Sequence, residues 1–294
     1  MNPGIVYATL AFVMWGLFPL YFHRIAAVPA LEVILHRSAW SMLFVLGLLA
    51  ALGRFDWLRT LRSQPRQIGS FALSALLLSG NWLLYVYAVQ SGQVVEASLG
   101  YFINPIVSVL LGVLVLHERL NRVQWTAVAL AAAGVLWLTA LAGRLPWIAL
   151  LLAVSFGLYG LMRKTSSLGA LEGLALETML MAPLVVPLLS WWTLRGSGAL
   201  AHGDVALNSW LIIGGPMTAL PLLLFAAGAR RISMTTLGLL QYIGPSIQFA
   251  LGVWLFNEPF GGARLAGFGL IWAALLVYSA DGWWTTRRAV PAAA

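Results

Sequence analysis

Long apolar segments, separated by short clusters of charged residues, limit the folds open to this chain more than any other feature. Hydrophobic residues make up 61% of its 294 residues and charged residues only 9%, against about 45–50% and about 25% in soluble proteins. This excludes a soluble globular enzyme and predicts an all-α integral membrane protein. We expect ten transmembrane helices, at roughly 3–22, 33–53, 67–90, 94–116, 122–142, 145–162, 171–193, 207–229, 232–256 and 264–284.

The basic residues are distributed unevenly over the predicted loops. With the N-terminus in the cytoplasm, the cytoplasmic loops carry twelve of the 17 Lys and Arg residues and the opposite loops carry four, while Arg37 lies inside a span. Because cytoplasmic loops are enriched in Lys and Arg, both termini are predicted to be cytoplasmic. The net charge of +8 does not indicate nucleic acid as a partner, since the basic residues lie in loops between spans and not on one solvated face.

Several chemistries lack the residues that they require. The chain has no cysteine, and its only lysine, Lys164, follows an arginine, so thiolate ligands and the G-K-[ST] end of a nucleotide-binding loop are both missing. The four histidines are far apart in the sequence and form no H-E-x-x-H motif. We therefore expect no enzymatic activity, no cofactor and no metal.

The two halves of the chain repeat one another. At a shift of 141, Leu10, Val13, Gly16, Leu17 and Leu20 coincide with Leu151, Val154, Gly157, Leu158 and Leu161. At a shift of 140, Pro105, Leu111, Gly112 and Glu118 coincide with Pro245, Leu251, Gly252 and Glu258. Five spans per half is an odd number, so the second half enters the membrane from the opposite side. The prediction is two inverted five-helix repeats, at 1–143 and 144–286, followed by a short tail at 287–294.

Particular sequence strings resemble a known family. They are 96–105 (EASLGYFINP), 80–84 (GNWLL), 236–245 (TLGLLQYIGP), His36-Arg37, Arg163-Lys164 and Glu177-Thr178. Together they closely resemble the RarD subgroup of EamA-type transporters, in the drug/metabolite transporter superfamily, over essentially the whole chain. The resemblance implies that each half is one EamA-like repeat. It also implies a multi-pass carrier of the bacterial inner membrane that exports small metabolites or drugs, and the subgroup's name is associated with chloramphenicol sensitivity.

Two charged residues lie inside predicted spans, where a charge costs about 2.5–3.5 kcal/mol. Arg37 in the second span and Glu177 in the seventh occupy equivalent positions at the shift of 140. Arg37 is a candidate to hold an anionic group of a substrate, and Glu177 to bind a coupling proton or a substrate amine. The alternatives are a structural ion pair, or side chains that reach separately to opposite membrane surfaces.

Proline and glycine at corresponding positions in the fourth and ninth spans predict that both helices are bent or locally opened near the middle of the membrane. Opened backbone and nearby amides bind ligands in many carriers, although such residues also serve helix packing. The candidate substrate-binding residues are Arg37, Asn81, Tyr101, Asn104, Gln241, Tyr242 and Gln248. The candidate residues for helix breaks or gating are Pro105, Gly244, Pro245, Glu118 and Glu258. Further aromatic candidates for contact with a substrate are Trp15, Trp82, Tyr85, Tyr87 and Tyr159.

Glu118 and Glu258 follow corresponding spans of the two halves. A local ion pair or a helix cap is one interpretation, and a gating latch is the other. Small residues in the fifth and tenth spans permit close helix packing, either within one chain or in a homodimer. They are Ala127, Ala131 and Gly134 in the fifth span, and Ala266, Gly269 and Ala273 in the tenth.

The expected partners are therefore the lipid bilayer and a small-molecule substrate. We expect a secondary-active exporter that works by alternating access and couples export to protons at Glu177. A passive channel and a lipid flippase remain the alternatives. A channel gives flux that does not saturate, whereas a flippase moves lipid without any soluble substrate.

Overall fold

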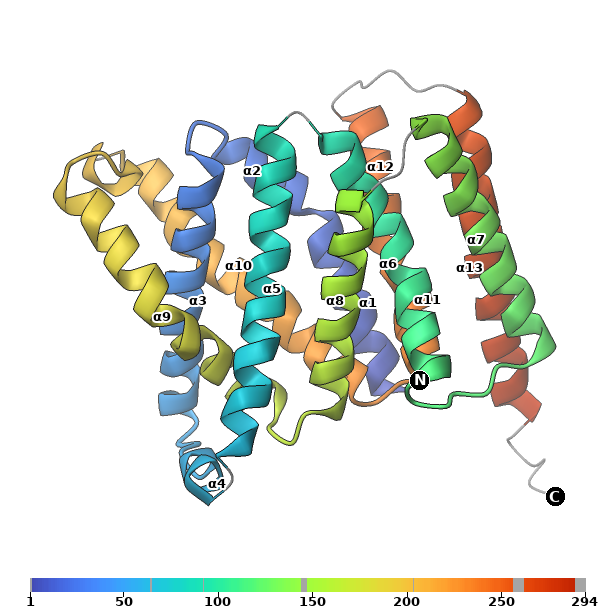
Figure 1. Ribbon diagram of the computed structural model, residues 1–294, viewed down its shortest axis with the longest axis horizontal. Coiled ribbons are helices and arrows are strands. Elements are labelled where there is room, and N and C mark those ends of the chain that lie inside the picture. Colours follow the sequence, from blue (N-terminus) through green and yellow to red (C-terminus); the bar gives the residue numbers. More distant parts are fainter. Residues whose placement is uncertain are drawn as a thin grey trace.

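The computed structural model describes residues 2–63, 65–91, 93–143, 147–202, 204–255 and 262–288. Within these ranges the chain is helical, with no β-strand (Figure 1). The helices are α1 (Pro3–Gly16), α2 (Phe18–Arg24), α3 (Ala30–Ala51), α4 (Trp57–Ser63), α5 (Arg66–Gln90), α6 (Val94–Leu114), α7 (Arg122–Ala142), α8 (Trp147–Thr165), α9 (Ala170–Leu194), the 3₁₀ helix η1 (Ala199–His202), α10 (Val205–Ala229), α11 (Met234–Gln241), α12 (Ile243–Trp254) and α13 (Gly262–Arg288).

Eight helical segments in the described part of the chain are long and apolar enough to cross a membrane. They are Pro3–Arg24, Ala30–Ala51, Arg66–Ala88, Arg122–Leu141, Trp147–Thr165, Ala170–Leu194, Val205–Ala229 and Leu265–Gly282. The chain is therefore a multi-pass membrane protein. The two remaining predicted spans, 94–116 and 232–256, overlap α6 and the α11–α12 pair, whose apolar helices are shorter.

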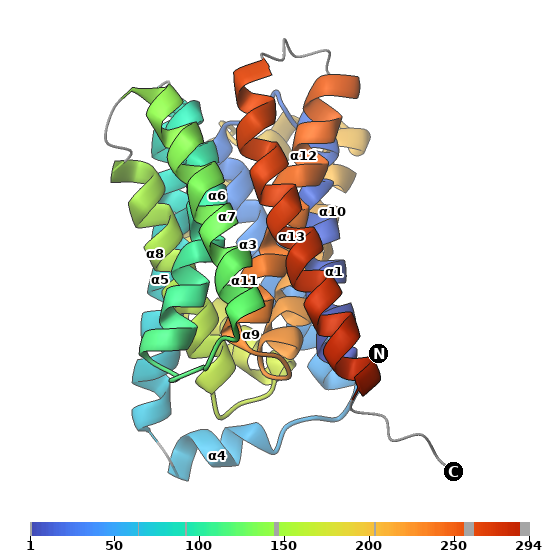
Figure 2. The same ribbon diagram turned by 90° about the vertical axis from the view of Figure 1, so that its right-hand side faces the viewer.

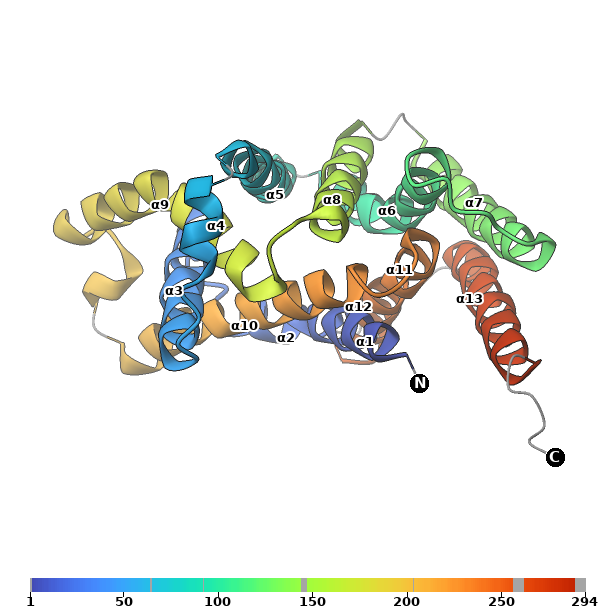
Figure 3. The ribbon, with the colours of Figure 1, turned by 90° about the horizontal axis from the view of Figure 1, so that it is seen from below.

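The start of α1 and the end of α13 lie at the same end of the bundle, which we call the termini end (Figure 1). Helix α4 and the connections α6–α7, α8–α9 and α10–α11 also lie there, and Figure 2 shows the same arrangement from the side. We call the opposite end, which carries the α2–α3 and α5–α6 connections, the far end. Seen from below, α9, α5, α8, α6 and α7 form one row and α10, α1, α12 and α13 another, with α3 between them at one edge (Figure 3).

Two of the helical segments are interrupted, and only one interruption was predicted. Helix α11 ends at Gln241 and α12 begins at Ile243, close to Pro245, as the proline and glycine pattern of the ninth span predicts. The sequence analysis missed the break at Leu17, which separates α1 from α2 just before Pro19. Proline has no amide N–H, so residues 19 and 245 donate no hydrogen bond to the carbonyl oxygens of Trp15 and Gln241, four residues earlier, and both breaks lie within these intervals.

The fourth predicted span, by contrast, is not opened. Helix α6 runs without interruption from Val94 to Leu114, with Pro105 inside it, so the expected break at that proline is wrong. Helix α6 packs against α8 and α11, and a Cβ atom built on Gly238 of α11 would lie 2.7 Å from the Pro105 carbonyl oxygen. Close packing on both sides thus holds α6 straight although one backbone hydrogen bond is lost at the proline.

The small residues of the fifth and tenth spans pack within one chain, because α7 and α13 lie against each other. A Cβ atom on Gly134 would lie 2.7 Å from the Gly267 carbonyl oxygen, whereas one on Gly269 would meet nothing within 4 Å. Gly134 therefore allows the close approach of these two helices, while Gly269 does not contribute to it. The homodimer stays a prediction.

We expect Gly134→Ala to destabilise the protein by about 1–3 kcal/mol, because the added methyl group overlaps the backbone of α13. Gly269→Ala adds the same methyl group into open space and serves as the matched control. The measurement is the melting temperature of each variant in detergent. Equal melting temperatures for the two variants would contradict the close approach of α7 and α13.

Candidate functional site

A cavity of about 470 Å³ lies in the middle of the bundle. This volume is in the range of about 300–1,000 Å³ that suits small organic ligands. Its walls come from α1, α2, α3, α5, α6, α8, α10, α11 and α12, so both halves of the chain contribute. It reaches Ile25, Ala26 and Val28 in the α2–α3 connection at the far end.

Eight of the predicted site residues line this cavity: Arg37, Asn81, Tyr101, Asn104, Gln241, Gly244, Pro245 and Gln248. Three of the further aromatic candidates, Trp15, Trp82 and Tyr85, line it as well. The remaining predicted residues in the described part of the chain, Tyr242, Pro105, Glu177 and Glu118, lie elsewhere. Glu258 lies outside the described residues.

Among the described residues that line the cavity, Arg37 alone has a formally charged side chain. Its Nε atom donates a hydrogen bond of 2.7 Å to Thr218 Oγ1, and that hydroxyl donates to the Gly214 carbonyl oxygen at 2.7 Å. Its guanidinium carbon lies 5.2–5.4 Å from the ring centroids of Phe18, Phe22 and Trp82. No sequence pattern distinguishes Thr218 or the two phenylalanines, since threonine and phenylalanine are common in apolar helices.

Three of the four predicted amide side chains in the wall connect helices to one another. Asn81 Nδ2 donates to the Leu152 carbonyl oxygen and to Ser155 Oγ, both at 2.8 Å. Gln241 Nε2 donates to Ser108 Oγ at 3.1 Å, and Gln248 Nε2 donates to the Trp15 carbonyl oxygen at 3.1 Å. These three amides therefore shape the cavity by fixing the helices around it.

Asn104 is the exception among these amides. Its side chain is buried, and its Oδ1 atom has no hydrogen-bond partner in the described part of the chain. A buried amide without a partner is costly in an apolar medium. The Asn104 oxygen is thus the one amide acceptor of the wall that is buried without a hydrogen-bond partner among the described residues.

The two predicted tyrosines are placed differently. Tyr101 lines the cavity, and its ring lies 6.2 Å from that of Tyr85. Tyr242 is fully buried in a hydrophobic cluster with Phe102 and Phe268, away from the cavity. Tyr242 therefore belongs to the packing at the α11–α12 break.

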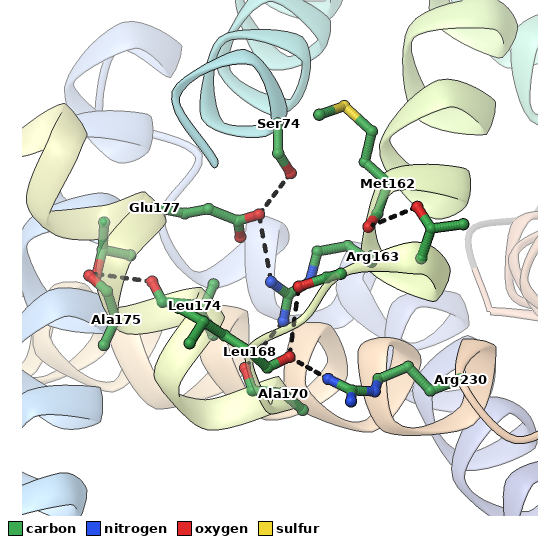
Figure 4. Close-up of polar contacts among 12 residues, drawn as sticks. Ser74, Met162, Arg163, Leu168, Ala170, Leu174, Ala175, Glu177 and Arg230 are labelled. Carbon is green, nitrogen blue, oxygen red and sulfur yellow. Dashed lines mark hydrogen bonds and ion pairs between the residues drawn. The ribbon is translucent and has the colours of Figure 1, made fainter. Parts of the chain in front are cut away.

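Glu177 lies outside the cavity, among residues of α5, α8 and α9 near the termini end (Figure 4). Its Oε1 atom accepts a hydrogen bond of 2.5 Å from Ser74 Oγ and lies 3.5 Å from Arg163 Nη1. Arg163 also donates from Nη2 to the Ala170 carbonyl oxygen at 3.0 Å. Both members of this ion pair are at most 2% exposed.

Arg37 and Glu177 do not form an ion pair, although they occupy equivalent positions in the sequence. The partner of Glu177 is Arg163, and the sequence analysis did not assign this pair. A Cβ atom on Gly173 would lie 2.9 Å from Arg163 Cζ. The absence of a side chain at Gly173 therefore gives the guanidinium its space beside α9.

The termini end is held together by polar contacts between helices. Lys164 Nζ donates to the carbonyl oxygens of Ala229 and Ile232, and Arg230 donates to that of Leu168 (Figure 4). A cation at the C-terminal end of α10 also interacts favourably with the helix dipole. These contacts join α8, α10 and the connections beside them below the cavity.

Glu118 caps the start of α11. It accepts hydrogen bonds from the backbone N–H groups of Met234 at 2.6 Å and Thr235 at 3.0 Å, and from the Thr235 hydroxyl at 2.8 Å. The preceding residue, His117, has a φ of 54°, a left-handed conformation that turns the chain after α6. The cap interpretation agrees with this geometry, with the difference that the capped helix belongs to the other half of the chain.

The comparisons with known proteins agree with a transporter fold. The EamA-like transporter family matches residues 2–140. An uncharacterized transporter of Pseudomonas aeruginosa is 44% identical over 98% of this chain and 97% of its own. Protein RarD of Streptomyces exfoliatus is 45% identical over 97% of this chain and 90% of its own. A crystal structure of a protein 19% identical to this one has the same fold, with a TM-score of 0.71 over 93% of this chain and 96% of that one.

The Arg163–Glu177 pair gives a prediction for stability. We expect Arg163→Met to destabilise the protein by about 3–5 kcal/mol, because it leaves a buried carboxylate without its partner. The double variant Arg163→Met/Glu177→Gln removes both charges and should recover most of that loss. Melting temperatures of the two variants in detergent measure this, and a double variant no more stable than the single one would contradict it.

The cap on α11 gives a second prediction. Glu118→Gln weakens the acceptor and removes its charge from the helix N-terminus, so we expect a loss of about 0.5–2 kcal/mol in stability. Glu172→Gln, which removes a carboxylate paired with the exposed Arg54, is the control. Altered transport by Glu118→Gln at unchanged melting temperature would support a gating latch instead of a cap.

Proposed function

Because this chain belongs to the RarD group of EamA-type transporters, we propose that it is a secondary-active exporter of small metabolites or drugs in the bacterial inner membrane. The observation that carries the proposal is the cavity of about 470 Å³ built from both halves of the chain. It reaches the far end, while the termini end is held by the contacts of Lys164, Arg230 and Glu118. A site that is accessible from one side at a time is the requirement of alternating access.

We further propose ten membrane crossings arranged as two inverted repeats, at 1–143 and 144–286. The pattern of helix contacts supports this, because exchanging the halves maps most of the contacts between long helices onto one another or onto themselves. In the exchange, α1–α10 corresponds to α8–α5, α3–α10 to α9–α5, and α1–α12 to α8–α6. The contacts α3–α9, α6–α11 and α7–α13 map onto themselves. Such a two-fold relation makes outward-open and inward-open states similar in packing and therefore similar in free energy.

The orientation follows from charge. Most of the basic residues lie at the termini end, which is favoured on the cytoplasmic side. In this orientation both termini are cytoplasmic, and the cavity of the structure faces the periplasm. The contacts around Lys164 then close the cytoplasmic entrance, which argues against a permanently open channel.

Proton coupling at Glu177 is the finer part of the proposal. The carboxylate lies between the cavity and the termini end, and its Oε2 atom has no hydrogen-bond partner among the described residues. When the termini end opens, water reaches this carboxylate and a proton binds. Protonation weakens the attraction to Arg163, which links the charge of Glu177 to the packing of α8 against α9.

The test is transport by purified protein in liposomes, with a mixed panel of metabolites and drugs that includes chloramphenicol, with and without an imposed pH gradient. We expect saturable flux that the gradient drives uphill. Flux that does not saturate would support a channel, and movement of lipid without any solute flux would support a flippase.

We expect Glu177→Gln to abolish the effect of the pH gradient on flux while exchange of solute continues, because the amide binds no coupling proton. Glu172→Gln, on the same helix but in an exposed pair, is the matched control and should respond to the gradient like the parent protein. If the single variant folds poorly, Arg163→Met/Glu177→Gln replaces it. Gradient-driven flux that persists in both Glu177 variants would contradict coupling at this residue.

A further inference from the structure

We propose that the central cavity binds an organic monoanion, whose anionic group lies on Arg37 and whose apolar, aromatic body lies against the rings of the wall. This inference rests on the proposed function, because it names the class of substrate that the same cavity accepts. It is carried by the charge, hydrogen bonding and aromatic surroundings of Arg37.

The first step is the missing counter-charge. Arg37 is 8% exposed, and no carboxylate in the described part of the chain lies within 4.0 Å of its guanidinium. A buried guanidinium without an anion is costly in the middle of a membrane protein. Arg163, which is also buried, has Glu177 as its partner, whereas Arg37 has no anionic partner among the described residues.

The second step is geometry. Thr218 occupies only the Nε atom of Arg37, and the other two guanidinium nitrogens make no hydrogen bond with any described residue. With Nε fixed, the Nη1 and Nη2 atoms form a fork that suits the two oxygens of a carboxylate. Gly214 lets the Tyr21 hydroxyl and the stem of Arg37 pack closely against α10, since a Cβ atom on it would overlap Tyr21 Oη and lie 3.3 Å from Arg37 Cγ.

The third step is the rest of the wall. Three rings lie close to the guanidinium and partly stabilise its charge while the cavity holds no anion. Deeper in the cavity, Trp15 lies 5.6 Å from Phe12 and 5.7 Å from Phe156, measured between ring centroids. These surfaces accept an aromatic or branched apolar body by stacking. Asn104, whose buried Oδ1 atom has no partner among the described residues, adds a polar group to the same wall.

The charges of the wall also define what the cavity excludes. With Arg37 as the one formal charge among the described lining residues, a monoanion gives a neutral complex. A dianion leaves one negative charge unpaired in an apolar site, and a cation adds a second positive charge. The expected order of affinity for one apolar body is therefore monoanion first, then neutral compound, then dianion and cation.

The experiment compares four probes that share one phenyl body: 3-phenylpropanoate, 3-phenylpropanamide, 3-phenylpropan-1-amine and benzylmalonate. Binding to the purified protein in detergent is measured by calorimetry. We expect 3-phenylpropanoate to bind about tenfold or more tightly than the amide, which is the scale of charged hydrogen bonds. We expect the amine and benzylmalonate to bind more weakly than 3-phenylpropanoate.

Two sets of variants separate the site from general charge effects. Arg37→Gln should remove the preference for the acid over the amide, whereas Arg195→Gln, which removes a positive charge stacked on Trp191, should preserve it. If Arg37→Gln folds poorly, Thr218→Val releases only the Nε atom and should reduce the preference, while Thr218→Ser should retain it. A melting curve for each variant confirms folding.

Three results would overturn the inference: equal binding of acid and amide, an unchanged preference in folded Arg37→Gln, or no binding of any probe at millimolar concentration. Liposome flux separates this failure from that of the proposed function. Saturable flux of neutral solutes without any binding of the acid would support the exporter and contradict the anion site. Selective binding of the acid without flux of any solute would support the anion site and contradict the exporter.

Discussion

The low polarity of the membrane interior is the constraint on which this structure depends, because every polar group within the bundle needs a partner inside the protein. Most of the polar side chains meet this requirement by joining helices. Asn81 joins α5 to α8, Gln241 joins α11 to α6, and Glu177 holds Arg163 between α8 and α9. Arg37 and Asn104 meet the requirement only in part, and both line the cavity. Other buried polar atoms without a partner among the described residues, such as Tyr242 Oη, lie away from the cavity, so it is the position of Arg37 and Asn104 in the wall that supports the proposed ligand site.

The two proposed repeats differ in the residues at corresponding helix ends. At the shift of 141 in the proposed repeat, Arg163 and Lys164 of α8 correspond to Phe22 and His23 of α2. On α8 the two cations bind carbonyl oxygens and Glu177, which holds the termini end together. On α2, Phe22 instead lines the cavity and lies beside Arg37. This difference gives a physical reason why the cavity of the structure reaches the far end and not the termini end.

The amino-acid sequence predicted spans and helix breaks correctly where neighbouring residues decide them. It predicted them less well where packing between helices decides them. The apolar segments and the break beside Pro245 follow from hydropathy and from the missing donor of proline. Pro105 carries the same local signal, yet α6 stays continuous because α8 and α11 pack against it. The break at Leu17 went unpredicted, although Pro19 follows it, because the surrounding apolar run reads as one span.

The candidate site divides in the same way. The sequence determined that a charged residue lies in each of two equivalent spans and that amides lie in the fourth and ninth, because composition and order alone decide this. Only the tertiary structure decided which of them meet: Arg37 lies with Thr218 and three aromatic rings, Glu177 with Arg163, and Glu118 with the first turn of α11. The physical reason is distance along the chain. The hydrogen bonds of Arg37 to Thr218, of Ser74 to Glu177 and of Met234 to Glu118 each join residues more than 100 positions apart. The aromatic contacts of Arg37 join different helices around the cavity. Their pairing depends on how the helices pack, and no local pattern records that.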